Sequence, residues 1–422
     1  MASARQKWGK APTSTAVKPN APPRDAFAAL MQGAAQDKAL AAVHAGTSAG
    51  VRGSFGGRGQ GMGGGRGRGG GRGGWGSAGR GGRLPPFKRI EGTRFIVDGF
   101  THGVAPGDLY FLTHFHADHY VGITKRWSAP VHASAVTANL VVRRLGLPRE
   151  QLVVLPMDTP TELDGGAARV TCIDANHCPG AVLLLFQLRD GRAILHTGDF
   201  RYDASTMPRH PALAALPPGG IDSLYLDTTY LDPSHRFPTQ SAAVQHVVDT
   251  CRLLLPAQRT LVLFGSYSIG KERVFMQVGK DLGVRIHAER PKMRLLECME
   301  LPAEEKAVLT SDAAATRWRV VPMAHLRADK LRSLLGAMRD RFDAVVAFRP
   351  SGWCFGRGGG AAGRSIKLSN NVTIVEVPYS EHSSFDELCA CVRDLRPRKV
   401  VATVDGGPLG NRHKGMAHLL EL

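Results

Sequence analysis

Four potential metal ligands lie within six residues of this chain, directly after a short apolar run. Residues 113–119 are Thr-His-Phe-His-Ala-Asp-His, and the run before them is Asp-Leu-Tyr-Phe-Leu. In extended backbone His114 and His116 point to the same side, so both imidazoles can reach one ion. Asp118 and His119 follow in a turn, where they can face a second ion. A polar loop with satisfied histidines is the alternative, but this density, with a carboxylate added, favours a hydrolytic metal site.

Two later residues become candidate ligands beside this motif. His177 lies in the segment Asp-Ala-Asn-His-Cys-Pro-Gly-Ala (174–181), and Asp199 lies in His-Thr-Gly-Asp-Phe-Arg (196–201). Each occupies a turn that adjoins an apolar run. Taken alone, each fits a turn or packing role better than a metal-ligand role. His196 is expected to be structural, because it lies within a strand.

From about Pro85 onward, short apolar runs separated by Gly, Pro and Asp predict buried strands. The predicted strands cover 108–113, 181–186, 192–196 and 223–227, and predicted helices cover 241–255 and 324–338. This alternation is typical of a layered α/β fold with the strands inside and the helices outside. Several polar and ionisable residues come just after these strands, where sheet proteins place their sites.

Residues 1–84 are expected to form a disordered tail. They carry 13 basic and 2 acidic side chains, which accounts for most of the net charge of +18. The tract from Arg52 to Arg83 is rich in Arg and Gly and has few side chains to bury, so burial cannot offset its ordering entropy. Its arginines either contact phosphates and unpaired bases or form a flexible, solubilising tether. Residues 25–31 have apolar side chains at helical spacing, either as a docking helix for a partner or as a transient helix without a role.

Composition excludes several classes of protein. No stretch approaches the roughly 18 apolar residues of a membrane-spanning helix, and the start of the chain lacks the apolar centre of a secretion signal. The seven cysteines are irregularly spaced between Cys172 and Cys391, which favours a reducing, intracellular compartment. A basic chain suggests a polyanionic partner such as nucleic acid.

The motifs together resemble the metallo-β-lactamase superfamily and, within it, its β-CASP nuclease branch. The segments at 111–120, 174–181, 196–201, 226–230 and 378–385 look like those of the DNA interstrand-crosslink-repair nucleases, relatives of Artemis and Apollo. The resemblance runs from about Pro86 to the C-terminus. It implies an α/β fold, the metallo-β-lactamase αββα sandwich, with an inserted α/β cap domain of the β-CASP type. The expected division is a metallo-β-lactamase domain in two parts, 85–232 and 371–422, with the cap at 233–370.

The resemblance also implies the roles of single residues. His114, His116 and His177 would surround a first metal, and Asp118, His119 and His382 a second, with Asp199 bridging the two. Zinc is the expected metal, with the second position open to Mg²⁺ or Mn²⁺, and Asp118 is a catalytic candidate as well as a ligand. Asp227 would orient a ligand histidine or assist proton transfer. A late valine, Val404, is the residue type that favours DNA over RNA in this branch.

The segment 265–271, Gly-Ser-Tyr-Ser-Ile-Gly-Lys, matches the spacing of a nucleotide-binding loop. Glu272 stands where such a loop needs Ser or Thr for magnesium, so the nucleotide interpretation is poor. The same string resembles the family's segment near a pocket for a terminal phosphate, which implies Ser268, Gly270 and Lys271 as donors to a 5′-phosphate. A glycine-rich strand-to-helix turn is the structural alternative. Arg349 is either a DNA contact or a buried ion-pair partner.

The sequence thus predicts a zinc-dependent phosphodiesterase, a 5′→3′ exonuclease that acts on 5′-phosphorylated DNA in interstrand crosslink repair. The alternatives are an RNA-processing β-CASP nuclease, a structure-specific DNA endonuclease, and a catalytically silent scaffold that only binds DNA. The expected protein is a nuclear monomer without membrane contact. Its expected partners are DNA and, through the N-terminal tail, other repair proteins.

Overall fold

A computed structural model describes residues 84–354, 364–369, 371–404, 415–417 and 419. Residues 1–83, which hold the Arg-Gly tract and the apolar segment 25–31, lie outside the described residues, so the predicted disorder of the tail stays a prediction. Within the part of the chain that is described, no helix is both long enough and apolar enough to cross a membrane.

Two sheets form one half of the molecule. The first is fully parallel, in the order β1-β2-β3-β4, and the second runs β17-β9-β8-β7-β6-β5 with antiparallel pairing from β5 to β8 and parallel pairing from β8 to β17. The strands of the first sheet are β1 (Phe95–Val97), β2 (Leu109–Phe111), β3 (Val131–Ser134) and β4 (Leu152–Leu155). Those of the second are β5 (Thr161–Leu163), β6 (Ala168–Asp174), β7 (Val182–Leu188), β8 (Ala193–His196), β9 (Ser223–Leu226) and β17 (Val400–Ala402).

The two sheets are joined by a buried apolar cluster. Phe95 and Phe111 from the first sheet pack against Phe186 from the second, with their ring centroids 5.4 and 5.2 Å from that of Phe186. Because each strand buries alternate side chains on one face, both sheets hide an apolar surface in this layer. The predicted strands that follow 108, 181, 192 and 223 are confirmed within a few residues.

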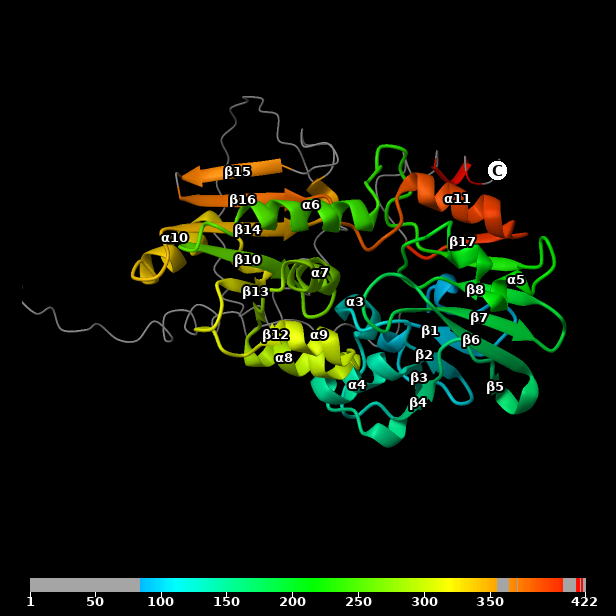
Figure 1. Ribbon diagram of the computed structural model, residues 1–422. Coiled ribbons are helices and arrows are strands. Elements are labelled where there is room, and N and C mark those ends of the chain that lie inside the picture. Colours follow the sequence, from blue (N-terminus) through cyan, green and yellow to red (C-terminus); the bar gives the residue numbers. More distant parts are fainter. Residues whose placement is uncertain (1–83, 355–363, 370, 405–414, 418, 420–422) are drawn as a thin grey trace, which may run out of the picture.

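Helices cover the outer faces of this sandwich. Helix α4 (Ala135–Leu145) lies beside β3 and β4, whereas α5 (Pro211–Ala214) and α11 (Phe385–Leu395) lie near β8 and β17 (Figure 1). Helix α11 begins with a capping box between Ser384 and Glu387, which satisfies two backbone N–H groups at its start. The order helix, sheet, sheet, helix confirms the predicted αββα arrangement.

A seven-stranded sheet forms the other half, in the order β12-β11-β13-β10-β14-β16-β15. It is parallel except for β15 against β16. Its strands are β10 (Thr260–Ser266), β11 (Ile286–His287), β12 (Leu309–Thr310), β13 (Trp318–Pro322), β14 (Ala344–Pro350), β15 (Arg364–Ser369) and β16 (Val372–Val377). Its helices are α6 (Gln240–Leu253), α7 (Glu272–Leu282), α8 (Arg290–Leu296), α9 (Ala303–Val308) and α10 (Ala328–Ala337).

This second half corresponds to the predicted cap. One face of its sheet packs Leu261 and Val345 against Leu331 and Leu334 of α10, and the other packs Phe264 and Phe348 into a core with α6 and α7. The sheet continues to Val377, beyond the boundary expected at 370, because β16 pairs with β14 rather than with the sandwich. The division of the chain into domains stays a prediction.

The two halves meet at the edge where the cap strands end. In Figure 1 the short helix α3 (Ala117–Tyr120) lies between the sandwich and the cap, near the end of α7. The loop after β10 reaches the sandwich here, since the Ile269 carbonyl oxygen lies 3.4 Å from His116 Nε2. The carboxyl ends of parallel strands from both halves therefore face one junction.

Candidate metal centre

Four of the predicted ligands follow the end of a strand at this junction. His114 comes after β2, His177 after β6, Asp199 after β8, and His382 after β16. His116 has extended backbone and forms the N-cap of α3, so Asp118 and His119 lie in one helical turn rather than in an open turn. Buried strands thus place four of the ligands, and the start of α3 places the other three.

The structure brings all seven predicted ligands together in groups that share one carboxylate. The atoms of each group lie within 4.8 Å of one another. Asp199 belongs to all of the groups, which are His114-His116-His177-Asp199, Asp118-His119-Asp199 and Asp199-Asp227-His382. Its Oδ2 atom lies 3.2 Å from His119 Nε2 and 3.7 Å from His114 Nε2. This position between the histidines is what a bridging ligand requires.

Hydrogen bonds fix which nitrogen of each imidazole faces the centre. His177 Nδ1 donates to the Glu381 carbonyl oxygen at 2.8 Å, and His116 Nε2 points to the Ile269 carbonyl oxygen. The Thr113 hydroxyl donates to Asp98, so its oxygen accepts from His114 Nδ1 at 3.0 Å. The opposite nitrogen of each of the three rings therefore carries a lone pair.

These three lone pairs converge. His116 Nδ1 lies 3.0 Å from His114 Nε2 and 3.1 Å from His177 Nε2, with no proton left to share between them. Three acceptors at this spacing, with a carboxylate beside them, fit a divalent cation and would repel one another without it. The residues present therefore suit a metal with imidazole and carboxylate ligands.

His119 and His382, which belong to the second and the third of these groups, differ electrostatically from the histidines of the first. His119 Nδ1 contacts Asp98 Oδ2 at 2.7 Å, and His382 Nδ1 contacts Asp227 Oδ2 at 2.8 Å. Burial opposes protonation of both rings, but the nearby carboxylates outweigh it. They raise the pKa of His119 well above its ordinary value and that of His382 to about 9. In contrast, burial and the neighbouring histidines hold the pKa values of His114 and His177 well below 6.5.

Sequence reasoning missed Asp98, which lies beneath both groups. Its side chain is buried, it accepts from the Thr113 backbone N–H and hydroxyl, and it contacts His119. It thus orients His119 directly and His114 through Thr113, as outer-layer carboxylates do at metal sites. Asp98 follows β1, the neighbour of β2, so its place after an adjacent strand was the available signal.

The structure gives Lys271 a partner that local sequence did not reveal. Its Nζ donates to Glu381 Oε2 at 2.6 Å and its backbone N–H to Glu381 Oε1 at 2.8 Å, with both side chains more than nine-tenths buried. Gly270 has a φ of +96°, and a Cβ there would lie 2.9 Å from Glu381 Oε2. The geometry thus favours a structural role for this loop, while the predicted phosphate contact of Lys271 stays a prediction.

Ser268 and Arg349, two further residues predicted to contact phosphate or DNA, also form hydrogen bonds within the protein. Ser268 is exposed, and its carbonyl oxygen accepts from Lys292 Nζ at 3.0 Å. Lys292, which sequence reasoning missed, also pairs with the buried Glu272 at 2.6 Å and so holds the loop to α8. Arg349 donates to Glu376 at 3.4 Å and to the Leu326 carbonyl oxygen, which matches its ion-pair alternative.

Asp227 lies at the junction as predicted and touches a ligand. Besides its contact with His382, it accepts from the Thr229 backbone N–H at 3.0 Å and hydroxyl at 2.6 Å. These bonds, with the charge of His382, lower the pKa of Asp227 despite its burial. An ionised Asp227 that accepts from His382 Nδ1 leaves Nε2 directed at the centre, which agrees with an orienting role.

Comparisons with known proteins agree with this arrangement. Residues 96–263 match the description "Beta-lactamase superfamily domain" and residues 303–407 match "DNA repair metallo-beta-lactamase". The chain is 42% identical over 335 residues to the DNA cross-link repair protein SNM1 of Arabidopsis thaliana, covering 78% of this chain and 68% of that protein. This chain belongs to the DNA repair metallo-β-lactamase family. Membership implies a site for divalent metal, and the predicted resemblance and fold class are confirmed.

Other family members are similar over the same region. The DNA cross-link repair 1A protein of Gallus gallus is 41% identical, with 77% of this chain covering 33% of that protein. The protein named 5′ exonuclease Apollo of Gallus gallus is 34% identical, covering 75% of this chain and 63% of that one. The chain thus spans about a third of the length of the cross-link repair 1A protein that it matches.

Proposed function

We propose that this protein is a metal-dependent DNA nuclease that hydrolyses phosphodiester bonds from a 5′-phosphorylated end during interstrand crosslink repair in the nucleus. The observation that carries the proposal is the convergence of three imidazole lone pairs and the Asp199 carboxylate at the junction of sandwich and cap. The relatives named for cross-link repair and for 5′ exonuclease activity support the substrate and the polarity.

Zinc is the proposed occupant of the first group, because three imidazoles and one carboxylate are typical zinc ligands. The second group offers Asp118 and His119 beside Asp199, and zinc, Mg²⁺ and Mn²⁺ all suit a position richer in carboxylate. A bound divalent ion would supply Lewis-acid stabilisation of the charge that develops on the phosphate.

The chain's own side chains would prepare the site for this reaction. Asp98 and Asp227 hold His119 and His382 in one tautomer, and the Glu381 carbonyl oxygen does so for His177. Because these orienting groups are buried, the imidazoles need little reorganisation when substrate arrives. Asp118, whose side chain is 59% exposed, lies on the solvent side of the set, where a substrate phosphate would approach the metal that Asp118 would help to hold.

Replacing Asp227 by asparagine is expected to reduce DNA cleavage about 10–100-fold, the usual effect of removing an orienting group behind a metal ligand. In one rotamer of the asparagine, the amide nitrogen faces His382 Nδ1 and the hydrogen bond is lost. In the other rotamer, the amide oxygen accepts from Nδ1 but holds the ring less strongly than a carboxylate. Steady-state cleavage and metal content measured on the same sample would check this. An unchanged rate would refute the orienting role, whereas complete loss of activity with loss of metal would make Asp227 a ligand.

The 5′ polarity can be tested with four oligonucleotides, namely 5′-phosphorylated and 5′-hydroxyl single-stranded DNA and the matching RNAs. We expect the phosphorylated DNA to be degraded fastest, releasing nucleotides in order from the 5′ end. Equal rates on both 5′ ends would refute the phosphate preference, and internal products would indicate an endonuclease. Faster cleavage of RNA would favour the RNA-processing alternative and would contradict the preference for DNA predicted from Val404.

The same substrates can assign the phosphate contact. Ser268 is exposed in the loop that follows β10, whereas the side chain of Lys271 donates to Glu381. We therefore expect Ser268→Ala to narrow the difference between phosphorylated and hydroxyl ends without changing the unfolding temperature. If Ser268→Ala keeps the full preference, the phosphate is bound elsewhere.

A further inference from the structure

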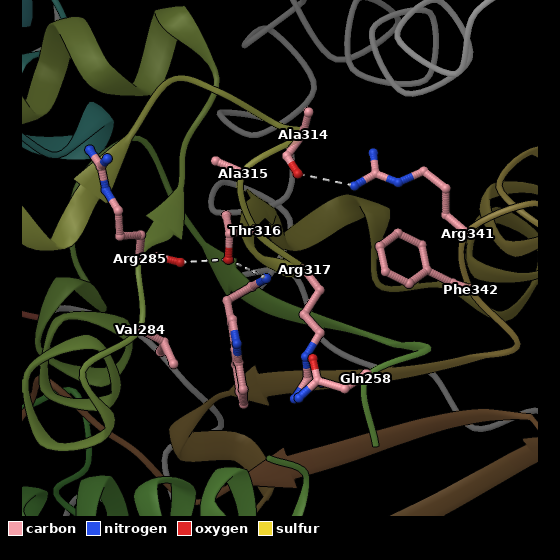
Figure 2. A pocket seen from close by; sticks show the side chains of 10 residues that line it. Gln258, Val284, Arg285, Ala314, Ala315, Thr316, Arg317, Arg341 and Phe342 are labelled. Atoms are coloured by element: carbon pink, nitrogen blue, oxygen red, sulfur yellow. Dashed lines mark hydrogen bonds between the residues drawn. The ribbon is translucent and has the colours of Figure 1, made fainter. Parts of the chain in front are cut away.

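A basic cavity lies at the amino-terminal ends of strands β10, β11, β13 and β14 of the cap sheet. It has a volume of about 590 Å³ and is lined by the segment from Ala314 to Trp318 together with Gln258, Val284, Arg285, Arg341 and Phe342. Figure 2 shows Arg285 and Arg341 on either side of this segment, with Arg317 between them. Of the residues that the structure describes, three arginines and no acidic side chain line the cavity.

Each of the three guanidinium groups is held by backbone carbonyl oxygens rather than by a carboxylate. Arg285 donates to Leu309, Arg341 to Ala314, and Arg317 to the carbonyl oxygens of residues 254, 255 and 260. Among the described residues, none of the three forms an ion pair. Because a carbonyl fixes the group without neutralising it, the cavity keeps three positive charges in nearly fixed positions.

Two of the cavity arginines lie over aromatic rings, and a further arginine is close by. Arg317 lies over the ring of Trp318 at 4.6 Å, and Arg341 over Phe342 at 5.3 Å, so apolar surface lies beneath both groups. Arg319 is buried nearby. Burial and the charge of Arg341 lower its pKa to about 10, although Glu289 acts in the opposite direction. An anion in the cavity would relieve this repulsion.

The cavity is separate from the metal centre. Arg317 reaches the carbonyl oxygen of Thr260, the first residue of β10, whereas the loop after Ser266 at the other end of this strand adjoins His116. A seven-residue strand is about 20 Å long. In duplex DNA a strand advances 3.4 Å per nucleotide, so about six nucleotides cover this distance.

We propose that this cavity is an accessory phosphate-binding site for the nucleic-acid strand whose end lies at the metal centre. The inference rests on the proposed function in taking DNA as the polyanion. Guanidinium forks match the geometry of phosphate oxygens. The site adds affinity for long strands and takes no part in bond cleavage.

The test is the salt dependence of binding by the full chain with its metal retained, measured by fluorescence anisotropy on phosphorothioate strands that resist cleavage. In the double variant Arg285→Gln/Arg341→Gln we expect the slope of log affinity against log salt to fall by about 1.4 for a strand of about 40 nucleotides, since each lost phosphate contact removes about 0.7. A strand of about 2 nucleotides cannot span this distance even when fully extended, so it should bind equally to the variant and to the native protein.

Two matched variants make the result specific. Arg252→Gln removes an arginine of the cap that is already paired with Asp249, and it should leave the slope unchanged. Arg285→Lys/Arg341→Lys keeps the charge and should retain most of the slope. Unfolding temperatures would confirm that every variant is folded.

An unchanged slope in the Gln double variant, or an equal loss with the short strand, would overturn the proposal. So would displacement of the long strand by poly-glutamate as readily as by DNA, because the cavity would then bind any polyanion. If the native protein binds DNA with the expected slopes but cleaves none, the proposed function fails while the accessory site stands. If it cleaves DNA and the slopes do not differ, only the accessory site fails.

Discussion

Replacing Asp199 by asparagine is expected to lower the rate of DNA cleavage by at least about 10³-fold. This carboxylate belongs to every candidate ligand group, and its Oδ2 atom lies within 4.0 Å of four histidine nitrogens. Metal ions contribute several kcal/mol to stabilising such transition states, and 1.36 kcal/mol corresponds to a factor of ten in rate. We expect the metal content, measured by mass spectrometry, to fall with the rate.

The control for this substitution is Asp190→Asn. Asp190 lies in the turn between β7 and β8 and pairs with Arg192 at the surface, so its loss should change neither cleavage nor metal content. Circular dichroism and unfolding temperature would establish that Asp199→Asn is folded. A folded Asp199→Asn protein with native activity and native metal content would contradict the assignment of Asp199.

Replacing Lys271 by methionine is expected to lower the free energy of unfolding by about 3–5 kcal/mol, as is usual when one member of a buried ion pair is removed. The pair is buried on both sides, and the carboxylate of Glu381 would be left in the protein interior without its cation. Because the Glu381 carbonyl oxygen also orients His177, cleavage should fall together with stability. Urea unfolding measured with the full chain would give the free energy.

An exposed pair offers a matched control. Lys399 contacts Glu91 at the same distance of 2.6 Å, but both side chains are more than half exposed, so Lys399→Met should change stability little. The double variant Lys271→Met/Glu381→Leu removes both charges and should recover part of the loss. If Lys271→Met instead keeps native stability and loses only its preference for 5′-phosphate, Lys271 is the phosphate donor that its sequence motif suggested.

The sandwich and the ligands at 114–119 could be predicted because their signals are local. Each strand is a short apolar run, and His114 follows such a run while His177 and Asp199 lie in turns that adjoin one. The density of ligands at 114–119 predicted a metal site from local sequence, whereas the family resemblance was needed to place His177 and Asp199 in it. His382 lies far along the chain, and only the family resemblance placed it with the others.

The missed residues depend on contacts between distant segments. Glu381 lies 110 positions from Lys271 and adjoins a ligand, so local sequence gave no reason to expect an ion pair. Lys292 resembles any helical lysine until the fold brings the loop of residues 266–268 to it. The Gly-x-x-x-x-Gly-Lys spacing predicted a phosphate contact, which stays a prediction. In the structure Gly270 leaves room for Glu381, and the backbone N–H of Lys271 donates to that carboxylate.

The central claim, that the junction holds metal ions that cleave 5′-phosphorylated DNA, is tested most directly by depletion and restoration of metal. The protein is stripped with a chelator, its metal content is measured, and cleavage of 5′-phosphorylated single-stranded DNA is followed as zinc is returned. We predict no cleavage by the stripped protein, recovery in proportion to bound zinc, and no recovery in Asp199→Asn. Undiminished cleavage by protein shown to be free of metal would contradict the claim.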